Sequence, residues 1–349
     1  MTAVLQGLRV PIVQAPMAGG PSTPELAAAV SNAGGLGFLA AGYKTVDAVR
    51  REIAKVRHAT SNAFGVNLFV PQADAADASQ LDAYIARIRD QAQAYGVAAG
   101  DARWSDDDWE QKLEVVAEVR PPVVSFTFGS PHSAVVHKLR AAGVEVWVTV
   151  TEPDEAQLAA TAGADALIVQ GVEAGAHRGS FVDADGTGVL GLLPLLRLVA
   201  RVTELPLVAS GGLADGYSIA AVLVAGAVAA QLGTAFLATP EAGTSRAHRA
   251  RLRQSGETRL TRAFTGRRAR AIVNEFLERN HEAAPSAYPH VYHLTAPLRA
   301  AARERDDFET MNLWAGQGYP LLEQDVDAAV LVAKLHQQME QAIDRACHK

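Results

Sequence analysis

One local pattern recurs along this chain of 349 residues: an alanine-rich segment ends in an Ala-Gly pair, and a short apolar run follows. The pairs end at Gly34, Gly143, Gly163 and Gly226. Glycine takes the left-handed conformation that ends a helix at little cost, so each pair predicts a helix C-terminus just before a strand. The runs are apolar throughout rather than alternating, which is typical of parallel strands buried on both faces.

Adding the remaining apolar runs gives eight predicted strands. They cover residues 10–14, 36–39, 64–69, 123–126, 144–150, 166–170, 207–210 and 228–232. Eight strands alternating with helices predict an α/β protein of the (β/α)8 TIM barrel class, with an open doubly wound sheet as the main alternative. A dinucleotide-binding fingerprint would follow the first strand, whereas Gly34, Gly35 and Gly37 precede or enter a strand. The strand count therefore favours the barrel.

Residues 166–181, ALIVQGVEAGAHRGSF, run from an apolar strand into a glycine-rich loop. Such loops bring backbone close to a ligand, because glycine has no side chain to block the approach. Gln170 lies where the strand becomes the loop, and His177 lies between Gly175 and Gly179. We predict a ligand site here, and an ordinary loop with an exposed histidine is the alternative.

One further glycine motif follows the seventh predicted strand, and another lies at the eighth. They are Ser210-Gly211-Gly212 and Gln231-Leu232-Gly233-Thr234. In TIM barrels these two loops commonly hold a phosphate with backbone N–H groups. The pair of motifs predicts a phosphate-bearing cofactor, with a purely structural double glycine as the alternative.

The sequence changes character after residue 239. We predict a barrel over residues 1–239, a smaller and mostly helical domain over the barrel mouth at residues 240–298, and a C-terminal segment, residues 299–349, that returns to the barrel. Arginine is frequent between residues 246 and 270, but few aromatic residues lie between the arginines, and the formal net charge of the chain is −6. We therefore expect a solvated helical surface rather than a nucleic-acid site.

Residues 218–238 carry no charge and are long enough to span a bilayer. Glycine and polar residues interrupt them, so we predict a helix, a turn at Ala225-Gly226 and a buried strand. The N-terminal residues lack the pattern of a secretory signal. Cys347 is the single cysteine, which excludes an internal disulfide and a cysteine metal cluster. We expect a cytoplasmic protein with no metal site and no membrane or nucleic-acid partner.

The motifs resemble the nitronate monooxygenase family, formerly called 2-nitropropane dioxygenases, whose members are FMN-dependent TIM barrels. The resemblance rests on PIVQAPMAGG (11–20), GVNLFVP (65–71), VSFTFG (124–129), QGVEAGAHRG (170–179), ASGGL (209–213) and QLGT (231–234). TGRRARAIVN (265–274) and LWAGQG (313–318) extend it, so it covers most of the chain.

The resemblance implies a set of FMN-binding residues and one catalytic residue. His177 would be the general base that takes a proton from the carbon bearing the nitro group, which suits a side chain that titrates near neutrality. The implied reaction is oxidation of an alkyl nitronate by O2 to a carbonyl compound and nitrite, and propionate 3-nitronate is one candidate substrate. The implied FMN contacts are Ala15, Pro16 and Met17 along the isoalloxazine ring, with Asn67, Gln170, Gly175, Gly211, Gly212, Gln231, Leu232, Gly233 and Thr234 elsewhere.

One position departs from the family pattern. Some family members have a histidine where this chain has Thr127, and this chain has His132 a few residues later.

The resemblance leaves two alternatives open. The family also includes enoyl-acyl-carrier-protein and quinone reductases that use NAD(P)H on the same FMN scaffold, which is the enzyme alternative. A flavin-binding protein without turnover is the non-enzyme alternative. We expect His132 and His137 to lie on the surface. We expect a small-molecule substrate and O2 as partners, and a homo-oligomer is left open.

Overall fold

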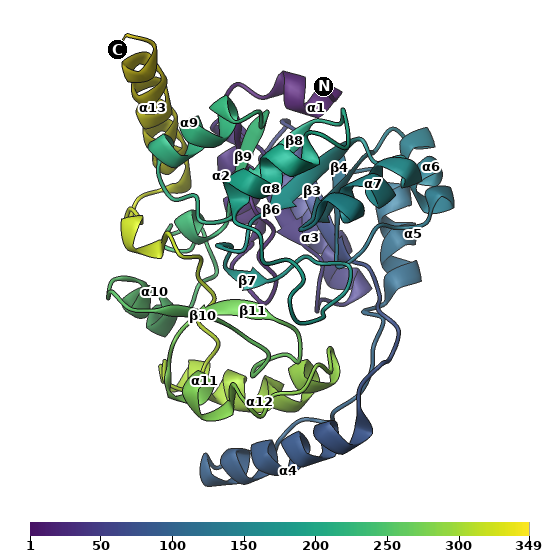
Figure 1. Ribbon diagram of the computed structural model, residues 1–349, viewed down its shortest axis with the longest axis vertical. Helices are drawn as coiled ribbons and strands as arrows, with labels where there is room; N and C mark the ends of the chain where they lie inside the picture. Colours follow the sequence, from purple (N-terminus) through teal and green to yellow (C-terminus); the bar gives the residue numbers. More distant parts are fainter. Residues whose placement is uncertain (349) are drawn as a thin grey trace.

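The computed structural model describes residues 1–348 and contains a closed barrel of parallel strands (Figure 1). In chain order the barrel strands are β1 (Ile12–Gln14), β2 (Gly37–Ala40), β3 (Phe64–Phe69), β4 (Val123–Thr127), β5 (Glu145–Val150), β6 (Ala166–Gln170), β8 (Leu207–Ser210) and β9 (Ala229–Leu232). Their order around the sheet is β1-β9-β8-β6-β5-β4-β3-β2, and a parallel bridge between Val13 and Leu36 closes it. The predicted barrel is confirmed, and the open sheet was wrong.

Helices surround the barrel at the positions that the Ala-Gly pairs indicate. The glycines of all four pairs have positive φ angles, from 81° at Gly143 to 110° at Gly226. Among residues 1–348, none of the helices is long and apolar enough to cross a membrane. The helices around the barrel are α2 (Pro24–Asn32), α3 (Val46–Ala59), α5 (Trp109–Val119), α6 (Ser133–Ala141), α7 (Pro153–Ala162), α8 (Leu192–Val199), α9 (Gly216–Val224) and α13 (Ala328–Cys347), which packs on α9 and α2.

The barrel interior is apolar at one end and polar at the other. Phe38, Trp147 and Ile168 pack together inside it with Leu5 of α1 (Ala3–Gly7). Polar residues replace this apolar cluster toward the C-terminal ends of the strands, where Gln14, Asn67, Thr149, Ser210 and Gln231 are buried. Because the strands are parallel, their C-terminal ends meet on one face, which is where TIM barrels place their sites.

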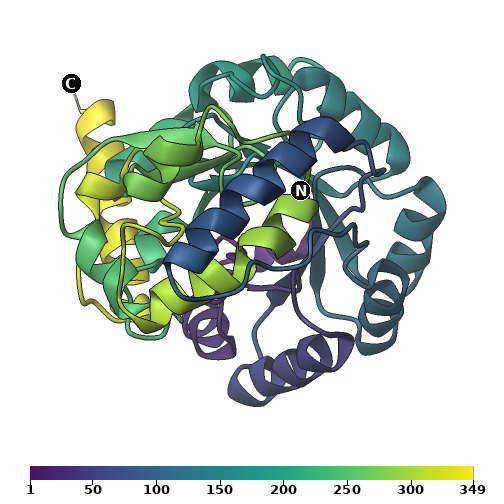
Figure 2. The same ribbon diagram turned by 90° about the horizontal axis from the view of Figure 1, so that it is seen from below.

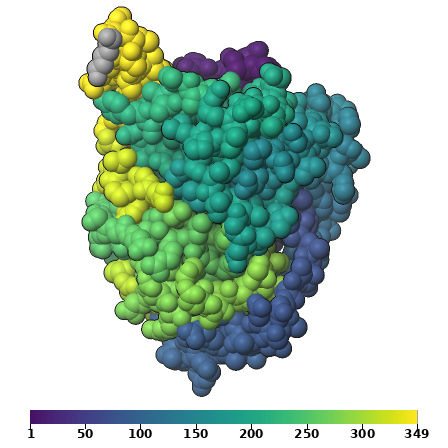
Figure 3. Space-filling model, in the orientation of Figure 1, coloured from purple at the N-terminus to yellow at the C-terminus, as the bar shows by residue number. Residues whose placement is uncertain are grey.

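A second group of elements covers this face. It comprises α4 (Ala78–Ala94), β10 (Thr258–Thr261), β11 (Ala269–Ile272), α11 (Glu275–Asn280) and α12 (His290–Glu304), which we call the cap. The cap has its own apolar core, in which Tyr84 of α4 packs near Phe264 and donates a hydrogen bond of 2.6 Å to the Ala263 carbonyl. Figure 2 shows α4 beside α12, and in Figure 3 the green residues form a layer between the teal barrel and the blue α4. Strands β10 and β11 form an antiparallel sheet with β7 (Ala176–His177).

The cap differs in detail from the expected helical domain. Residues 240–298 include two strands as well as α10 (Arg246–Leu252), and α12 continues past residue 298 to Glu304. Helix α4 belongs to the same core although it lies within residues 1–239, because its apolar face packs on residues 263–298. The division into residues 1–239, 240–298 and 299–349 stays a prediction.

Only part of the arginine-rich stretch is the solvated surface that we expected: the Arg246 and Arg253 side chains are exposed, whereas the arginines at its end are buried. Arg267, Arg268 and Arg270 are at most 7% exposed. Arg268 pairs with Asp183 at 2.7 Å, and Arg270 donates two hydrogen bonds to the Val172 carbonyl at 2.9 and 3.1 Å. These arginines therefore bind the cap to the loop that follows β6.

Candidate active site

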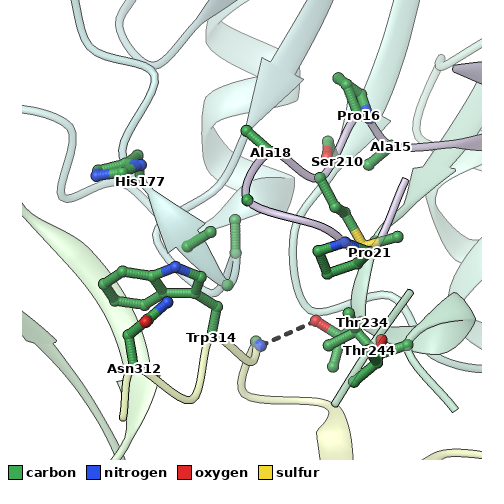
Figure 4. Close-up of a pocket in the computed structure, with 18 of the residues that line it drawn as sticks. Ala15, Pro16, Ala18, Pro21, His177, Ser210, Thr234, Thr244, Asn312 and Trp314 are labelled. Atoms are coloured by element: carbon green, nitrogen blue, oxygen red, sulfur yellow. Dashed lines mark hydrogen bonds between the residues drawn. The ribbon is translucent and has the colours of Figure 1, made fainter. Parts of the chain in front are cut away.

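A pocket opens at the C-terminal end of the barrel strands, under the cap. The empty space within it, including the open mouth, is about 1440 Å³. Most of the predicted site residues line it; they are Ala15, Pro16, Met17, Asn67, Gln170, Gly175, His177, Gly211, Gly212, Gln231, Gly233 and Thr234. Figure 4 labels Ala15, Pro16, His177 and Thr234 among them.

Leu232 is the exception among the predicted site residues. Its side chain packs in the core between the strands and the outer helices and is 1% exposed. Successive side chains of a strand point to opposite faces, so Gln231 and Leu232 of β9 cannot both face the pocket. The prediction included Leu232 because the resemblance implied the whole segment from Gln231 to Thr234.

Two amide side chains lie at the bottom of the pocket. Asn67 is fixed by donation to Ser125 Oγ at 2.9 Å and to Thr127 Oγ1 at 3.0 Å. Gln231 Nε2 approaches Ser210 Oγ at 3.5 Å, and Gln231 Oε1 is buried without a hydrogen-bond partner among residues 1–348. Buried acceptors in native proteins are almost always paired, so this oxygen fits a donor on a ligand.

Glycines form one wall of the pocket. Gly211 and Gly212 have φ angles of 120° and 70°, which a residue with a side chain adopts only with strain. Thr234 Oγ1 accepts a hydrogen bond of 3.0 Å from the Gly316 amide, which connects this wall to the C-terminal segment (Figure 4). A side chain at Gly175 would overlap the backbone of Ala315 and Gly316, so that segment can lie against the loop only because residue 175 is glycine.

Gln170 fixes the loop that carries His177. Its Oε1 accepts hydrogen bonds from Arg178 at 2.7 Å and from the Gly179 amide at 2.8 Å, and its Nε2 donates to the His177 carbonyl at 3.1 Å. Arg178 is fully buried and also donates to the Gly171 and Gly188 carbonyls. Gln170 lines the pocket, but its amide oxygen is already saturated by the protein.

His177 lies on β7, where pairing with Ala269 of β11 fixes its backbone. Its imidazole lies among three aromatic rings, Phe128, Tyr288 and Trp314, with ring centroids 5.6, 5.7 and 5.7 Å away. Its Nε2 atom lies 3.0 Å from Thr265 Oγ1. The barrel, the cap and the C-terminal segment each contribute a contact to this one side chain.

The surroundings of His177 keep it neutral. Burial, followed by the nearby Arg267 guanidinium, lowers the pKa of His177 from 6.5 to about 3. The cation form is disfavoured because the surrounding rings replace water. The expectation of a side chain that titrates near neutrality was therefore wrong for the flavin-free protein. A neutral imidazole has a lone pair that can accept a proton, but the lowered pKa makes it a weaker base than a free histidine.

Comparison with known proteins decides the family. The chain matches the family model described as nitronate monooxygenase over residues 3–338. It belongs to the nitronate monooxygenase family. It is therefore an oxidoreductase, and members of this family are generally flavin-dependent.

Relatives and solved structures agree with this assignment. The chain is 40% identical to a nitronate monooxygenase of Pseudomonas aeruginosa, covering 96% of this chain and 97% of that protein. It is 38% identical to one of Paraburkholderia phytofirmans, covering 98% and 95%. The structure of a nitroalkane oxidase from Streptomyces ansochromogenes matches with a TM-score of 0.96 and 47% identity over 99% of this chain and all of that one. FabK from Thermotoga maritima matches with a TM-score of 0.79 and 25% identity over 100% and 99%.

Several residues of this nitronate monooxygenase family pocket were not identified from the sequence. Trp314 and Gly316 belong to LWAGQG, a motif that resembles the family but to which we assigned no role. Thr244 and Asn312 lie outside every motif that we recognised. The remaining such residues include Tyr43, Phe69, Phe128, His248, Arg303 and Tyr319.

The histidines in and after the VSFTFG motif do not reach the site. His132 precedes α6, and His137 lies on that helix, and both are exposed, as expected. Thr127 of that motif lines the pocket. Within residues 1–348, no cluster of His, Cys, Asp and Glu could hold a metal ion.

Proposed function

We propose that this enzyme oxidises alkyl nitronates with bound FMN and O2 to a carbonyl compound and nitrite, with His177 as the general base for neutral nitroalkanes. The observation that carries the proposal is the position of His177 in the wall of the pocket that the expected FMN contacts also line. The name of the Streptomyces ansochromogenes structure, a nitroalkane oxidase, supports the substrate class. We further propose the cytoplasm as the location of the enzyme.

The residues present fit a flavin mononucleotide. Gln231 Oε1 is an acceptor that lacks a donor among the described residues, and a flavin ring carries an N–H group that could pair with it. A side chain on Gly233 would enter the pocket, 3.4 Å from Ala15 Cβ and 3.7 Å from Met17 Sδ. Gly211, Gly212, Gly233 and Thr234 would hold the phosphate, and Ala15, Pro16 and Met17 would lie along the ring.

The chain itself contributes proton transfer and an aromatic environment for the base. A neutral nitroalkane must lose a proton from the carbon that bears the nitro group, and the imidazole of His177 accepts it. Phe128, Tyr288 and Trp314 pack around the imidazole, which stays half-buried, and reduce its contact with water. When bound, FMN supplies the redox chemistry that oxidises the nitronate, with O2 as the final oxidant. A preformed nitronate has already lost its proton and does not need the base.

Anaerobic mixing of the flavin-loaded protein with one reductant at a time tests the proposal. We expect a nitronate to bleach the flavin absorbance rapidly, and NADH or NADPH to do so slowly. Rapid bleaching by NADH or NADPH, without reaction with any nitronate, would instead support the reductase. A yellow protein that reacts with none of these compounds would support flavin binding without turnover.

A further inference from the structure

We infer that Thr265 places the proton of the neutral His177 ring on Nε2, so that Nδ1 is the atom that accepts the substrate proton. Thr265 is then a positioning residue for the base. The inference rests on the proposed function for its catalytic meaning, but the tautomer itself is a property of the folded protein.

The hydrogen bonds of Thr265 carry the argument. Its Oγ1 lies 3.1 Å from the Arg267 carbonyl oxygen, 3.4 Å from the Arg267 amide nitrogen and 3.0 Å from His177 Nε2. A hydroxyl has one proton to donate and two lone pairs to accept with. The Arg267 carbonyl can only accept, and the Arg267 amide can only donate. The hydroxyl proton therefore goes to the Arg267 carbonyl, and one lone pair accepts from the Arg267 amide. The second lone pair faces His177 Nε2, which must then be the donor.

The alternative assignment leaves a buried group unpaired. If Thr265 donated to His177 Nε2, the Arg267 carbonyl would have no donor, because the structure of residues 1–348 provides none besides the Thr265 hydroxyl. Thr265 and Arg267 are each 2% exposed, so water cannot easily replace that donor. Unpaired buried carbonyls are uncommon in native proteins. The Nε2–H tautomer satisfies all four groups.

The tautomer decides whether His177 can be a base. With the proton on Nε2, Nδ1 carries a free lone pair, and Nδ1 has no hydrogen-bond partner among the described residues of the pocket it lines. With the proton on Nδ1, the remaining lone pair would point at Thr265 and no ring nitrogen would be free for substrate. When Nδ1 accepts a proton, the Nε2–H bond to Thr265 persists, so no hydrogen bond has to break.

The fold holds Thr265 in place. It lies in the turn between β10 and β11, where its amide donates a hydrogen bond of 3.2 Å to the Arg262 carbonyl. The next residue, Gly266, has a φ of 79°, and a side chain there would overlap the Ala287 carbonyl. The hydroxyl therefore meets the imidazole at a fixed position.

The test compares Thr265→Val, which keeps the shape and removes the hydroxyl, with Thr265→Ser, which keeps the hydroxyl. Thr239→Val is the matched control, because Thr239 is also a buried threonine that donates to a backbone carbonyl, that of Phe236 at 2.9 Å. The flavin-loaded proteins are labelled with 15N-histidine. Long-range proton–nitrogen NMR correlations then report the tautomer of His177, whose signal is assigned by its absence in His177→Asn. The ratio of kcat/KM for a neutral nitroalkane to that for its nitronate is measured in parallel.

We expect the Nε2–H pattern at His177 in the parent, in Thr265→Ser and in Thr239→Val. We expect Thr265→Val to lose that single pattern and to lower the ratio by roughly tenfold or more, with the roughly 10²–10⁴-fold that a positioned base contributes as the upper bound. An Nδ1–H pattern in the parent, or an unchanged pattern and ratio in Thr265→Val, overturns the inference. A parent with the Nε2–H pattern but no reaction with either substrate form contradicts the proposed function and leaves the assigned tautomer standing.

Discussion

The imidazole of His177 meets the ring of Phe128 edge to face, with 5.6 Å between the ring centroids. The Arg267 guanidinium lies over the same phenyl ring, 4.1 Å from its centroid. One aromatic side chain thus contacts both the proposed base and the cation that disfavours its protonation. This arrangement has a direct consequence for pH dependence.

We predict that kcat/KM for a neutral nitroalkane does not fall as the pH is lowered from about 7 to about 5. Protonation inactivates the base, and the pKa of His177 is lowered to about 3 by burial and by Arg267. An unperturbed histidine with a pKa near 6.5 would be mostly protonated at pH 5. The measurement is the pH profile of kcat/KM. A fall with an apparent pKa near 6.5 that disappears in His177→Asn would contradict the assigned environment.

Stability should decrease with acid over the same range. Burial also lowers the pKa of His248 to about 4. As the pH falls below 6.5, the unfolded chain binds protons at these positions before the folded chain does, so the free energy of unfolding falls until the folded pKa values are reached. The expected slope is up to about 1.4 kcal/mol per pH unit for each histidine.

Urea denaturation at pH 7 and pH 5 measures this slope. His248→Gln should reduce the difference between the two free energies of unfolding. His58→Gln is the control, because His58 is exposed near the end of α3, and it should leave the difference unchanged. If the free energy of unfolding changes equally with pH in the parent and in His248→Gln, burial in the folded protein does not lower the pKa of His248.

Gly233→Val should weaken FMN binding without disturbing the fold. Gly233 has a φ of −105°, which any residue adopts, and its side chain would enter the pocket beside Ala15 and Met17. Overpacking costs about 1–3 kcal/mol, which is roughly tenfold or more in Kd. Gly212 is a poorer test, since its φ is 70° and a side chain would come within 2.9 Å of Glu173 Cβ.

The measurement is the Kd for FMN, with thermal unfolding of the flavin-free protein as the check on folding. Gly7→Ala is the control, because nothing lies within 4 Å of the added atom. It should bind FMN as the parent does. Parental affinity in a folded Gly233→Val protein would remove Gly233 from the flavin site.

Arg268→Met should destabilise the fold strongly, whereas Arg246→Met should not. The Arg268 and Asp183 side chains are each 9% exposed, and removing one partner of a buried pair costs up to about 3–5 kcal/mol. Arg262 still pairs with Asp183 and should limit the loss. The Arg246 side chain is 86% exposed, where an ion pair contributes about 0–1 kcal/mol. Denaturant midpoints measure both, and equal effects would mean that Arg268 does not secure the loop.

The barrel could be predicted because its signals are local. Each strand is a short apolar run, and Gly143 or Gly226 ends a helix by its own conformational freedom. The sheet that fixes His177 could not be predicted in this way. Strand β7 has two residues, and its partner Ala269 lies 92 positions away in an arginine-rich stretch. Nothing in the local pattern of that stretch indicates a strand.

The same distinction applies to the site. Asn67 and Gln231 lie in predicted strands and Gly233 follows one, so the barrel geometry brings them together. Thr265 and Tyr288 reach His177 only because the cap folds over the mouth. Their roles depend on contacts between distant segments, which a single sequence does not display.

Turnover of His177→Asn on a nitroalkane and on its preformed nitronate tests the central claim most directly. With FMN bound at the parental level, we predict that kcat/KM for the neutral nitroalkane falls by roughly 10²–10⁴-fold, while kcat/KM for the nitronate changes much less. Equal rates for parent and His177→Asn on both substrate forms would contradict the claim that His177 is the base.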